Sequence, residues 1–238
     1  MKKFLITLII IVLLIVLVIG YLGFVPGLST LMGTNKPIDL GVSTVKDSLS
    51  SADKKVNISR VAMTGQAPAG KSISYEGSHN ANLSLSSAEF SALLLSGGWE
   101  FSEAVQNMQI KMDKDGKVEA SALVDIDKLE KYLNNTGLVD TKDFKAYTDK
   151  IKVFEKTAPI YLAGTGEVVN NKVKLNLDSV KVGRLPIPMN SESVGYLSQL
   201  LERRISAISG FQIDSAKVED GQLNFKGSLP NKVNVWPF

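Results

Sequence analysis

The feature that most constrains this chain is an uninterrupted apolar run from Phe4 to Val25, which contains no charged residue. An α-helix rises ~1.5 Å per residue, so this run is long enough to cross a hydrocarbon core of ~30 Å. A cleaved signal peptide is the alternative. Its apolar region usually spans only ~7–15 residues and ends in a small-residue cleavage site, and the sequence shows no such site here. We therefore expect an uncleaved transmembrane helix.

The basic residues around the run predict its orientation. Lys2 and Lys3 precede it, and the next basic residue is Lys36. Because basic residues are retained on the cytoplasmic side of a membrane, the N-terminus should lie in the cytoplasm and the remainder outside. The predicted localisation is a single-pass protein of the cell membrane with an extracytoplasmic C-terminal domain.

Breaks in the pattern predict three segments. Residues 1–25 are the cytoplasmic end and the anchor, and residues 26–56 are a linker. Residues 57–238 form an extracytoplasmic domain. The linker assignment rests on residues that interrupt regular structure, namely Pro26, Gly27, Gly33 and Pro37.

Composition narrows the function classes. The chain has no cysteine, so disulfides, thiol chemistry, thiolate metal sites and a lipoprotein anchor are all excluded. Without Lys2 and Lys3 it carries 25 basic and 24 acidic residues, which are mixed along the sequence. A near-neutral domain lacks the electrostatic signal of nucleic-acid binding, so we expect no nucleic-acid partner.

Turn signals between alternating apolar residues predict antiparallel hairpins. Asp115-Gly116, Asn170-Asn171 and Asp220-Gly221 each separate two such runs. Long antiparallel strands of this kind bury one face, which helices then cover.

Helix signals accompany the hairpins. Ser86 and Glu89 form a capping box before a short helix, and Asp127 with Glu130 is a second cap-like pair. Longer helices are expected over about 141–156 and 191–208. The second should bury one apolar stripe, consisting of Val194, Leu197, Leu200, Leu201, Ile205 and Ile208. A helix followed by an Asp-Gly hairpin occurs twice, which suggests an internal repeat. The predicted class is α+β, an antiparallel sheet with amphipathic helices packed on one face.

Residues that could carry chemistry have plainer structural explanations. His79 is the only histidine and has no cysteine to join it in a metal site. Asp113 to Gly116 resembles the start of a calcium loop, but Val124 stands where the loop needs a glutamate. No nucleophile elbow, phosphate loop or dinucleotide motif is present. We expect no enzyme, no cofactor and no metal.

Apolar side chains are the remaining candidates for function. Helical spacing aligns Phe144, Tyr147 and Phe154 on one helix, and Leu197 and Leu201 on another. They either pack an ordinary core or contact an apolar ligand in an elongated groove. At the C-terminus, Trp236 and Phe238 either pack the last strand or contact a partner, since aromatic residues are favoured at interfaces.

The C-terminal region resembles a known bacterial pattern. The residues that carry it are Val180 to Pro188, an amphipathic helix, Gly210 to Ile213, Val218 to Leu223 and Gly227 to Pro230. This order is similar to the ends of YpmS-type membrane-anchored extracytoplasmic proteins. More distantly it resembles LmeA-like proteins related to the tubular lipid-binding superfamily. The resemblance implies a curved antiparallel sheet around a long helix and the binding of a lipid or an envelope precursor.

Two functions are therefore expected from the sequence. The first is a non-enzymatic, membrane-tethered protein of the cell envelope that binds a lipid-like or other apolar ligand near the outer membrane face. A tether raises the effective concentration of such a domain at the bilayer. The second is a scaffold or assembly module that binds other envelope proteins.

Overall fold

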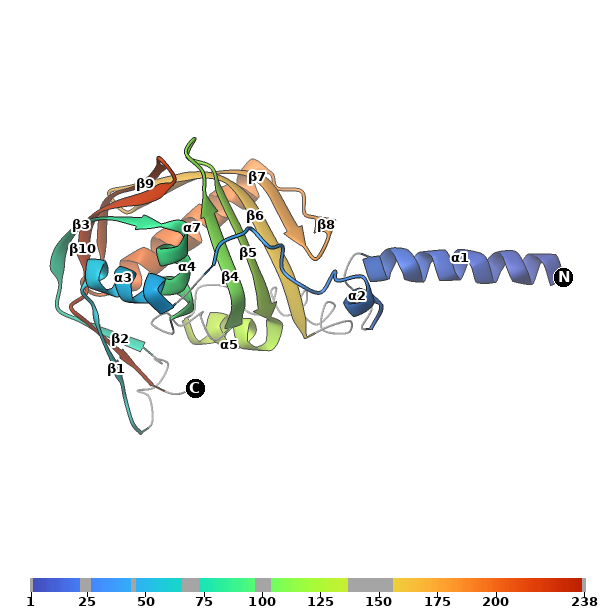
Figure 1. Ribbon diagram of the computed structural model, residues 1–238, viewed down its shortest axis with the longest axis horizontal. Coiled ribbons are helices and arrows are strands. Elements are labelled where there is room, and N and C mark those ends of the chain that lie inside the picture. The colour runs from blue at the N-terminus through green and yellow to red at the C-terminus, as the bar shows by residue number, and fades with distance from the viewer. Residues whose placement is uncertain are drawn as a thin grey trace.

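The computed structural model describes residues 2–21, 27–43, 46–65, 73–96, 104–136 and 156–236, without the side chains of residues 2–9 and 133–136. The helices are α1 (Lys2–Tyr21), α2 (Leu28–Leu31), α3 (Lys46–Val56), α4 (Ser87–Leu95), α5 (Ile126–Thr136) and α7 (Ser191–Ala207). The strands are β1 (Ser59–Ala62), β2 (Ile73–Glu76), β3 (His79–Ser86), β4 (Val105–Met112), β5 (Val118–Asp125), β6 (Thr157–Val169), β7 (Lys172–Val182), β8 (Leu185–Pro186), β9 (Gln212–Glu219), β10 (Gln222–Leu229) and β11 (Lys232–Val235). The predicted α+β class is confirmed (Figure 1).

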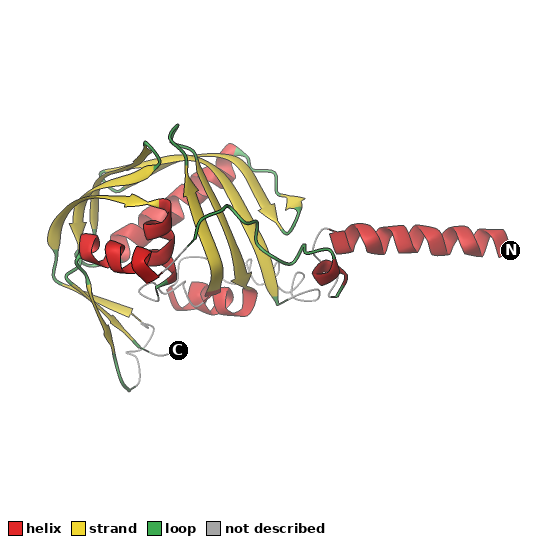
Figure 2. Cartoon of the chain, in the orientation of Figure 1, coloured by secondary structure: helices red, strands yellow, loops and turns green. Residues whose placement is uncertain are grey.

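The strands form two sheets. The large sheet is antiparallel throughout its described pairs and has the order β3-β10-β9-β6-β5-β4, with β7 and β8 along the other edge of β6. The small sheet has the order β1-β11-β2, in which β1 runs parallel to β11. In Figure 2 the large sheet arches over α3, α4 and α7.

The register shifts in three strand pairs of the large sheet. In two of them the extra residue is Asp178 of β7, opposite Ala163 and Gly164 of β6, and Asp214 of β9, opposite Lys226 and Gly227 of β10. Such a bulge bends and twists the strand that carries it. A Cβ at Gly164 would lie 2.2 Å from the carbonyl oxygen of Asn176, so only glycine fits there. Strand β6 pairs with β5 up to Gly164 and with β9 only from Glu167 onward. This change of partner along β6 separates the two halves of the arch.

All three predicted hairpin turns are confirmed. Asn170 and Asn171 both have positive φ, as do Asp220 and Gly221, and this is the backbone of the tight turns that suit twisted hairpins. At the Asp115-Gly116 turn the amide of Gly116 donates to the Asp113 carbonyl over 3.1 Å. The motif that resembled a calcium loop is therefore a hairpin turn.

Of the two predicted helix N-caps, one is confirmed and the other is not. The capping box is confirmed, because Ser86 Oγ accepts from the amide of Glu89 and Glu89 Oε2 accepts from that of Ser86. The prediction that Asp127 caps α5 was wrong. The helix begins at Ile126, and Asp125 Oδ1 accepts from the Lys128 amide at 3.1 Å. The capping carboxylate must precede the first helical residue.

The expected burial of the α7 stripe was also wrong. No residue of α7 is buried, although Ile208, directly after it, is. Leu201 is 41% exposed. The apolar side of α7 does not pack tightly against the sheet because a cavity lies between them.

The linker assignment needs a correction for its last eleven residues. Residues 46–56 form α3, which packs on α4 and buries Ala52 and Val56 in the main core. Their sequence is mostly polar and gives only two buried positions, so its apolar pattern is weak. Upstream, Gln109 Oε1 on β4 accepts from the amides of Leu40 and Val42, so this part of the linker is fixed to the sheet.

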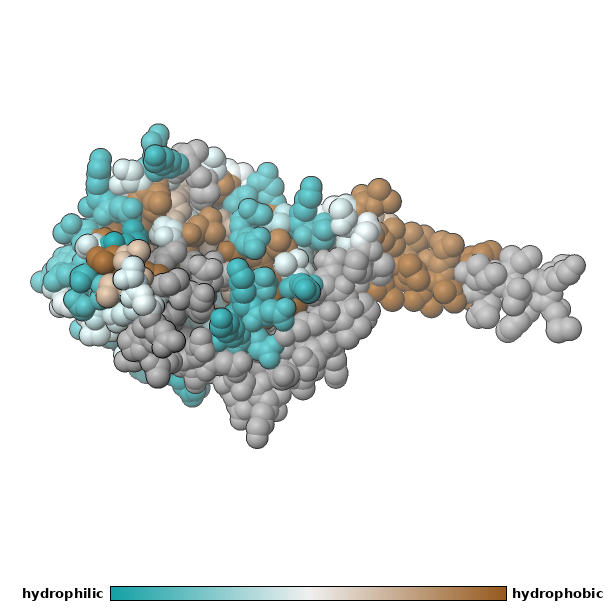
Figure 3. Space-filling view, turned by 90° about the horizontal axis from the view of Figure 1, so that it is seen from below, coloured by the Kyte–Doolittle hydropathy of each residue, from teal (hydrophilic) through white to brown (hydrophobic). Residues whose placement is uncertain are grey.

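Within the described residues, no helix is both long and apolar enough to cross a membrane. Helix α1 extends from the domain, and its described side chains from Ile10 to Val16 are exposed and apolar (Figure 3). Its C-terminal end is held by the domain. Thr34 Oγ1 donates to the Gly20 carbonyl at 3.0 Å, and Arg184 lies 4.7 Å from the centre of the Tyr21 ring.

Candidate apolar ligand site

An apolar cavity of about 390 Å³ lies between the large sheet, α4, α7 and the small sheet. This volume lies within the range of ~300–1,000 Å³ that is typical of ligand pockets. Among the described residues, every side chain that lines it is apolar except those of Arg60, Tyr75 and Arg204. The cavity therefore has an apolar body and a small number of polar groups.

One row of side chains in the sheet wall of the cavity crosses four strands. Leu83 pairs with Phe225, Phe225 pairs with Ala216, and Ala216 pairs with Val168. Residues that are directly opposite in neighbouring strands share a face of the sheet. The row comes from β3, β10, β9 and β6, and all four of its side chains line the cavity.

Helices supply the opposite walls. From α4 come Phe90, Leu93 and Leu94, and from α7 and its end come Leu201, Ile205 and Ile208. Leu201 is the only lining residue among those described that is exposed, so it marks the rim. Helix α4 is fixed to the sheet edge, because Ser91 Oγ accepts from the Ile110 amide at 2.7 Å.

The small sheet contributes the polar end. In β1, Arg60 is directly opposite Val233 of β11, and Val233 is directly opposite Tyr75 of β2. These three side chains form one row, and all of them line the cavity. Arg204 reaches this row from α7 and donates from Nη2 to Tyr75 Oη at 3.1 Å. Arg60 is paired with Asp53 of α3.

This arrangement suits a molecule that is mostly apolar. An apolar lining favours an apolar ligand, because each Å² of apolar surface removed from water on binding contributes roughly 25 cal/mol of free energy. No protein-family model, curated protein or solved structure matches this chain.

The sequence-predicted contact residues have different locations. Leu201 lines the cavity, and Leu197 is half-buried on the same helix without being part of the described lining. Phe144, Tyr147 and Phe154 lie outside the described residues. At the C-terminus Trp236 is half-buried next to β11, and Phe238 lies outside the described residues. A partner surface there stays a prediction.

Sequence reasoning missed the polar end. Arg204 follows Leu201 by three residues and precedes Ile208 by four, so it shares the apolar side of α7. A charged residue within an apolar stripe is a signal that could have identified it. Arg60 and Tyr75 gave no such signal, because they join through pairing with a strand about 160 to 170 residues later.

The residues considered for catalysis or metal binding make contacts that support the fold. His79 Nδ1 lies 2.9 Å from Asn231 Oδ1, and His79 Nε2 lies 3.1 Å from the Val56 carbonyl. This links β3 to the end of α3. Within the described part of the chain, acidic and histidine side chains form no cluster able to hold a metal ion.

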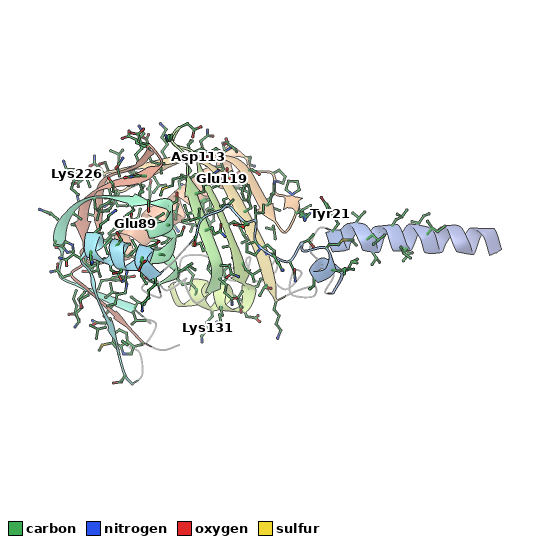
Figure 4. All side chains as sticks on the ribbon, viewed as in Figure 1. Tyr21, Glu89, Asp113, Glu119, Lys131 and Lys226 are labelled. Atoms are coloured by element: carbon green, nitrogen blue, oxygen red, sulfur yellow. The ribbon has the colours of Figure 1, made fainter. Side chains whose placement is uncertain are left out.

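Glu89 is the most perturbed acid among the described residues (Figure 4). Burial alone would raise its pKa, but hydrogen bonds outweigh that effect and lower the pKa to about 2. Lys55 Nζ donates at 2.8 Å and Ser51 Oγ at 2.6 Å, and both come from α3. Glu89 does not line the cavity, so its carboxylate joins α3 to α4 and does not contact the ligand site.

Proposed function

We propose that this chain is a non-enzymatic protein that binds a lipid-like ligand in the apolar cavity and is held at a membrane by α1. The observation that carries this proposal is the apolar lining, drawn from both sheets and three helices, α3, α4 and α7. The proposal extends to an extracytoplasmic position in the cell envelope, supported by the position of Lys2 and Lys3.

The size of the cavity supports a ligand energetically. The cavity is open at the Leu201 rim, so its apolar lining faces water when no ligand is bound. Covering such a surface with an apolar ligand is favourable by about 25 cal/mol for each Å² removed from water. A ligand that fills the space recovers contacts that the side chains cannot make among themselves.

Helix α1 supports a position at the membrane. Its described side chains expose a run of large apolar residues that no described part of the domain covers, and such patches are rare on soluble surfaces unless they bind something. A bilayer fits this surface, because the side chains from Ile10 to Val16 are apolar on every side of the helix. Anchoring through α1 would keep the cavity close to its ligands.

Blocking the cavity tests the proposal. Ala216 lies in the middle of the sheet wall, and Ala216→Phe would fill part of the space. The matched control is Ser215→Phe, because Ser215 is the neighbouring residue of β9 and points to the other face. The full chain is kept soluble with an amphipathic polymer, which is too large to enter the cavity. Binding of the neutral apolar probe N-phenyl-1-naphthylamine is measured by fluorescence.

We expect the unchanged chain and Ser215→Phe to bind the probe with similar affinity, and Ala216→Phe to bind it at least about tenfold more weakly. Thermal melting shows whether each variant folds. If Ala216→Phe does not fold, Leu201→Trp narrows the rim at an exposed position instead. Absence of probe binding to the unchanged chain, or equal binding by a folded blocked variant, contradicts the proposal.

A further inference from the structure

We infer that the end of the domain next to α1 lies in the head-group layer of a bilayer, which it contacts through Leu31 of α2 and Leu185 of β8. This inference rests on the proposed position of α1 in a membrane. It adds a second membrane-contacting surface, which belongs to the folded domain, and it states which end of the domain faces the lipid.

Helix α2 packs against the last turn of α1. A Cβ at Gly20 would lie 2.3 Å from Leu28 Cδ2, so Leu28 lies directly against the backbone of α1. Two hydroxyls bind the carbonyl of the same glycine, Ser29 Oγ donating at 3.2 Å and Thr34 Oγ1 at 3.0 Å. These contacts place α2 beside the end of α1 and not beyond it.

The exposed apolar surface of α1 continues onto α2. Tyr21 is the last residue of α1 and is exposed. Tyrosine is enriched at the membrane–water boundary, because its ring is apolar and its hydroxyl is polar. Leu31 is 85% exposed, more than any other large apolar side chain that the structure describes. Since α2 lies beside Gly20, Leu31 can leave water at the same boundary as Tyr21.

A distant part of the sequence joins this surface. Val182 of β7 pairs with Leu185 of β8, so the chain reverses over Gly183 and Arg184. The guanidinium carbon of Arg184 lies 4.7 Å from the centre of the Tyr21 ring, which Figure 4 labels at the domain end of α1. Leu185 is exposed beside it. Only the fold brings this turn to α1, so the surface belongs to the domain and not to its tether alone.

The charges of this surface suit lipid phosphates. Arg184 and Lys36 are both exposed, and Lys36 follows Thr34 by two residues. The segments 27–38 and 183–189 contain no acidic residue. Basic side chains are attracted to the anionic groups of a lipid surface, and the planar guanidinium of arginine matches a phosphate. Leucine beside arginine and lysine fits a boundary at which acyl chains meet phosphates.

A bilayer is favoured over a protein partner because this surface is continuous with α1. The described side chains of α1 from Ile10 to Val16 are apolar on every side of the helix, and lipid can surround such a helix completely. Any layer of lipid around α1 would reach α2 and the β7–β8 turn next.

The experiment uses the absence of cysteine from the chain, since a single introduced cysteine can carry a nitroxide label. The test variants are Leu31→Cys and Leu185→Cys. The membrane reference is Val12→Cys on α1, and the water reference is Val169→Cys. Val169 is apolar and exposed like Leu185, but it pairs with Lys172 at the opposite end of β7.

The full chain is placed in nanodiscs of phosphatidylcholine and phosphatidylglycerol. Electron paramagnetic resonance measures the access of each label to oxygen, which concentrates in the bilayer, and to nickel ethylenediaminediacetate, which stays in water. Thermal melting shows whether each labelled variant folds. If Leu185→Cys does not fold, Pro186→Cys carries the label, because Pro186 is the next exposed residue of β8.

We expect the ratio of oxygen access to nickel access at Leu31 and Leu185 to be at least about fivefold higher than at Val169, because interfacial side chains lie within the boundary between head groups and acyl chains. Val12 should give the highest ratio. Leu185 is the decisive position, because its place in the sequence does not hold it near α1.

The possible failures are distinguishable. If Leu185 matches Val169 while Val12 lies in the bilayer, the inference is wrong and the proposed membrane position of α1 stands, whatever the result at Leu31. If both reagents are excluded at Leu185 and two labels broaden each other's spectra, a second copy of the chain covers the surface, which also overturns the inference. If Val12 itself is accessible from water, the proposed membrane position is wrong as well.

Discussion

At the scale of single residues, Glu89 is the group whose protonation matters most for the fold. Its carboxylate accepts from Lys55 and Ser51 of α3 and from the amide of Ser86, so three chain segments meet at one side chain. The pKa of Glu89 lies at about 2, below its usual 4.5. A group with a lowered pKa in the folded state stabilises the fold fully above its unfolded pKa and loses that effect as the pH falls through its folded pKa.

We therefore expect Glu89→Gln to lower the free energy of unfolding by about 1–3 kcal/mol at neutral pH, because a hydrogen-bonded charge is lost. The difference between the two proteins should persist down to about pH 4.5 and vanish toward pH 2, where Glu89 itself is protonated. Urea denaturation across this range measures it. Asp178→Asn, at an exposed position of β7, is the control. A difference that does not change with pH would show that the carboxylate charge is unimportant.

At the scale of elements, the close approach of β6 to β7 beside the bulge at Asp178 depends on Gly164. A Cβ there would overlap the Asn176 carbonyl of β7, and backbone cannot move aside as a flexible side chain can. Gly164→Ala should destabilise the fold by about 2–4 kcal/mol. Gly195→Ala is the matched control, since a Cβ at this position of α7 meets nothing within 4 Å. It should stabilise the fold by about 0.5–1 kcal/mol, because alanine suits a helix interior.

Thermal unfolding of both glycine variants checks this pair. Opposite shifts of the melting temperature are the expected result. Equal shifts would mean that the close approach of β6 to β7 tolerates a side chain and that the arch does not depend on Gly164.

The same scale explains which elements could be predicted from the sequence. Turns such as Asn170-Asn171 and the Ser86 capping box depend on residues that are close in sequence, so they can be predicted from the local sequence alone. The polar end of the cavity depends on β1 pairing with β11, which joins Arg60 to Val233. No local pattern encodes a pairing over that separation. A helix around Val45–Ser51 gave only a weak signal in the sequence, because α3 has just two fully buried side chains, Ala52 and Val56.

At the scale of the whole molecule, α1 is connected to the domain by a segment that is itself bound to the sheet. The amides of Leu40 and Val42 both donate to Gln109 Oε1, at 2.8 and 3.3 Å. In Figure 1 this segment crosses in front of β4 and β5 on its way from α2 to α3. The domain is therefore held against its own linker.

Gln109→Ala removes the acceptor of both amides. Hydrogen exchange followed by mass spectrometry should show the amides of Leu40 and Val42 exchanging about tenfold faster, as expected when a hydrogen bond of about 1.4 kcal/mol is lost. The melting temperature of the domain should change little. Gln106→Ala, at an exposed position of the same strand, is the control. Unchanged exchange would mean that Gln109 does not hold the linker.

The contact between Tyr21 and Arg184 has a consequence for where the cavity operates. It joins the last residue of α1 to the turn between β7 and β8, and Thr34 fixes the neighbouring carbonyl of Gly20. With α1 in a bilayer, these contacts would hold the domain at one height and one tilt above the lipid surface. The cavity would then keep a fixed distance and orientation relative to the bilayer. Its ligands would have to reach it by lateral diffusion in the membrane or by transfer from a carrier protein.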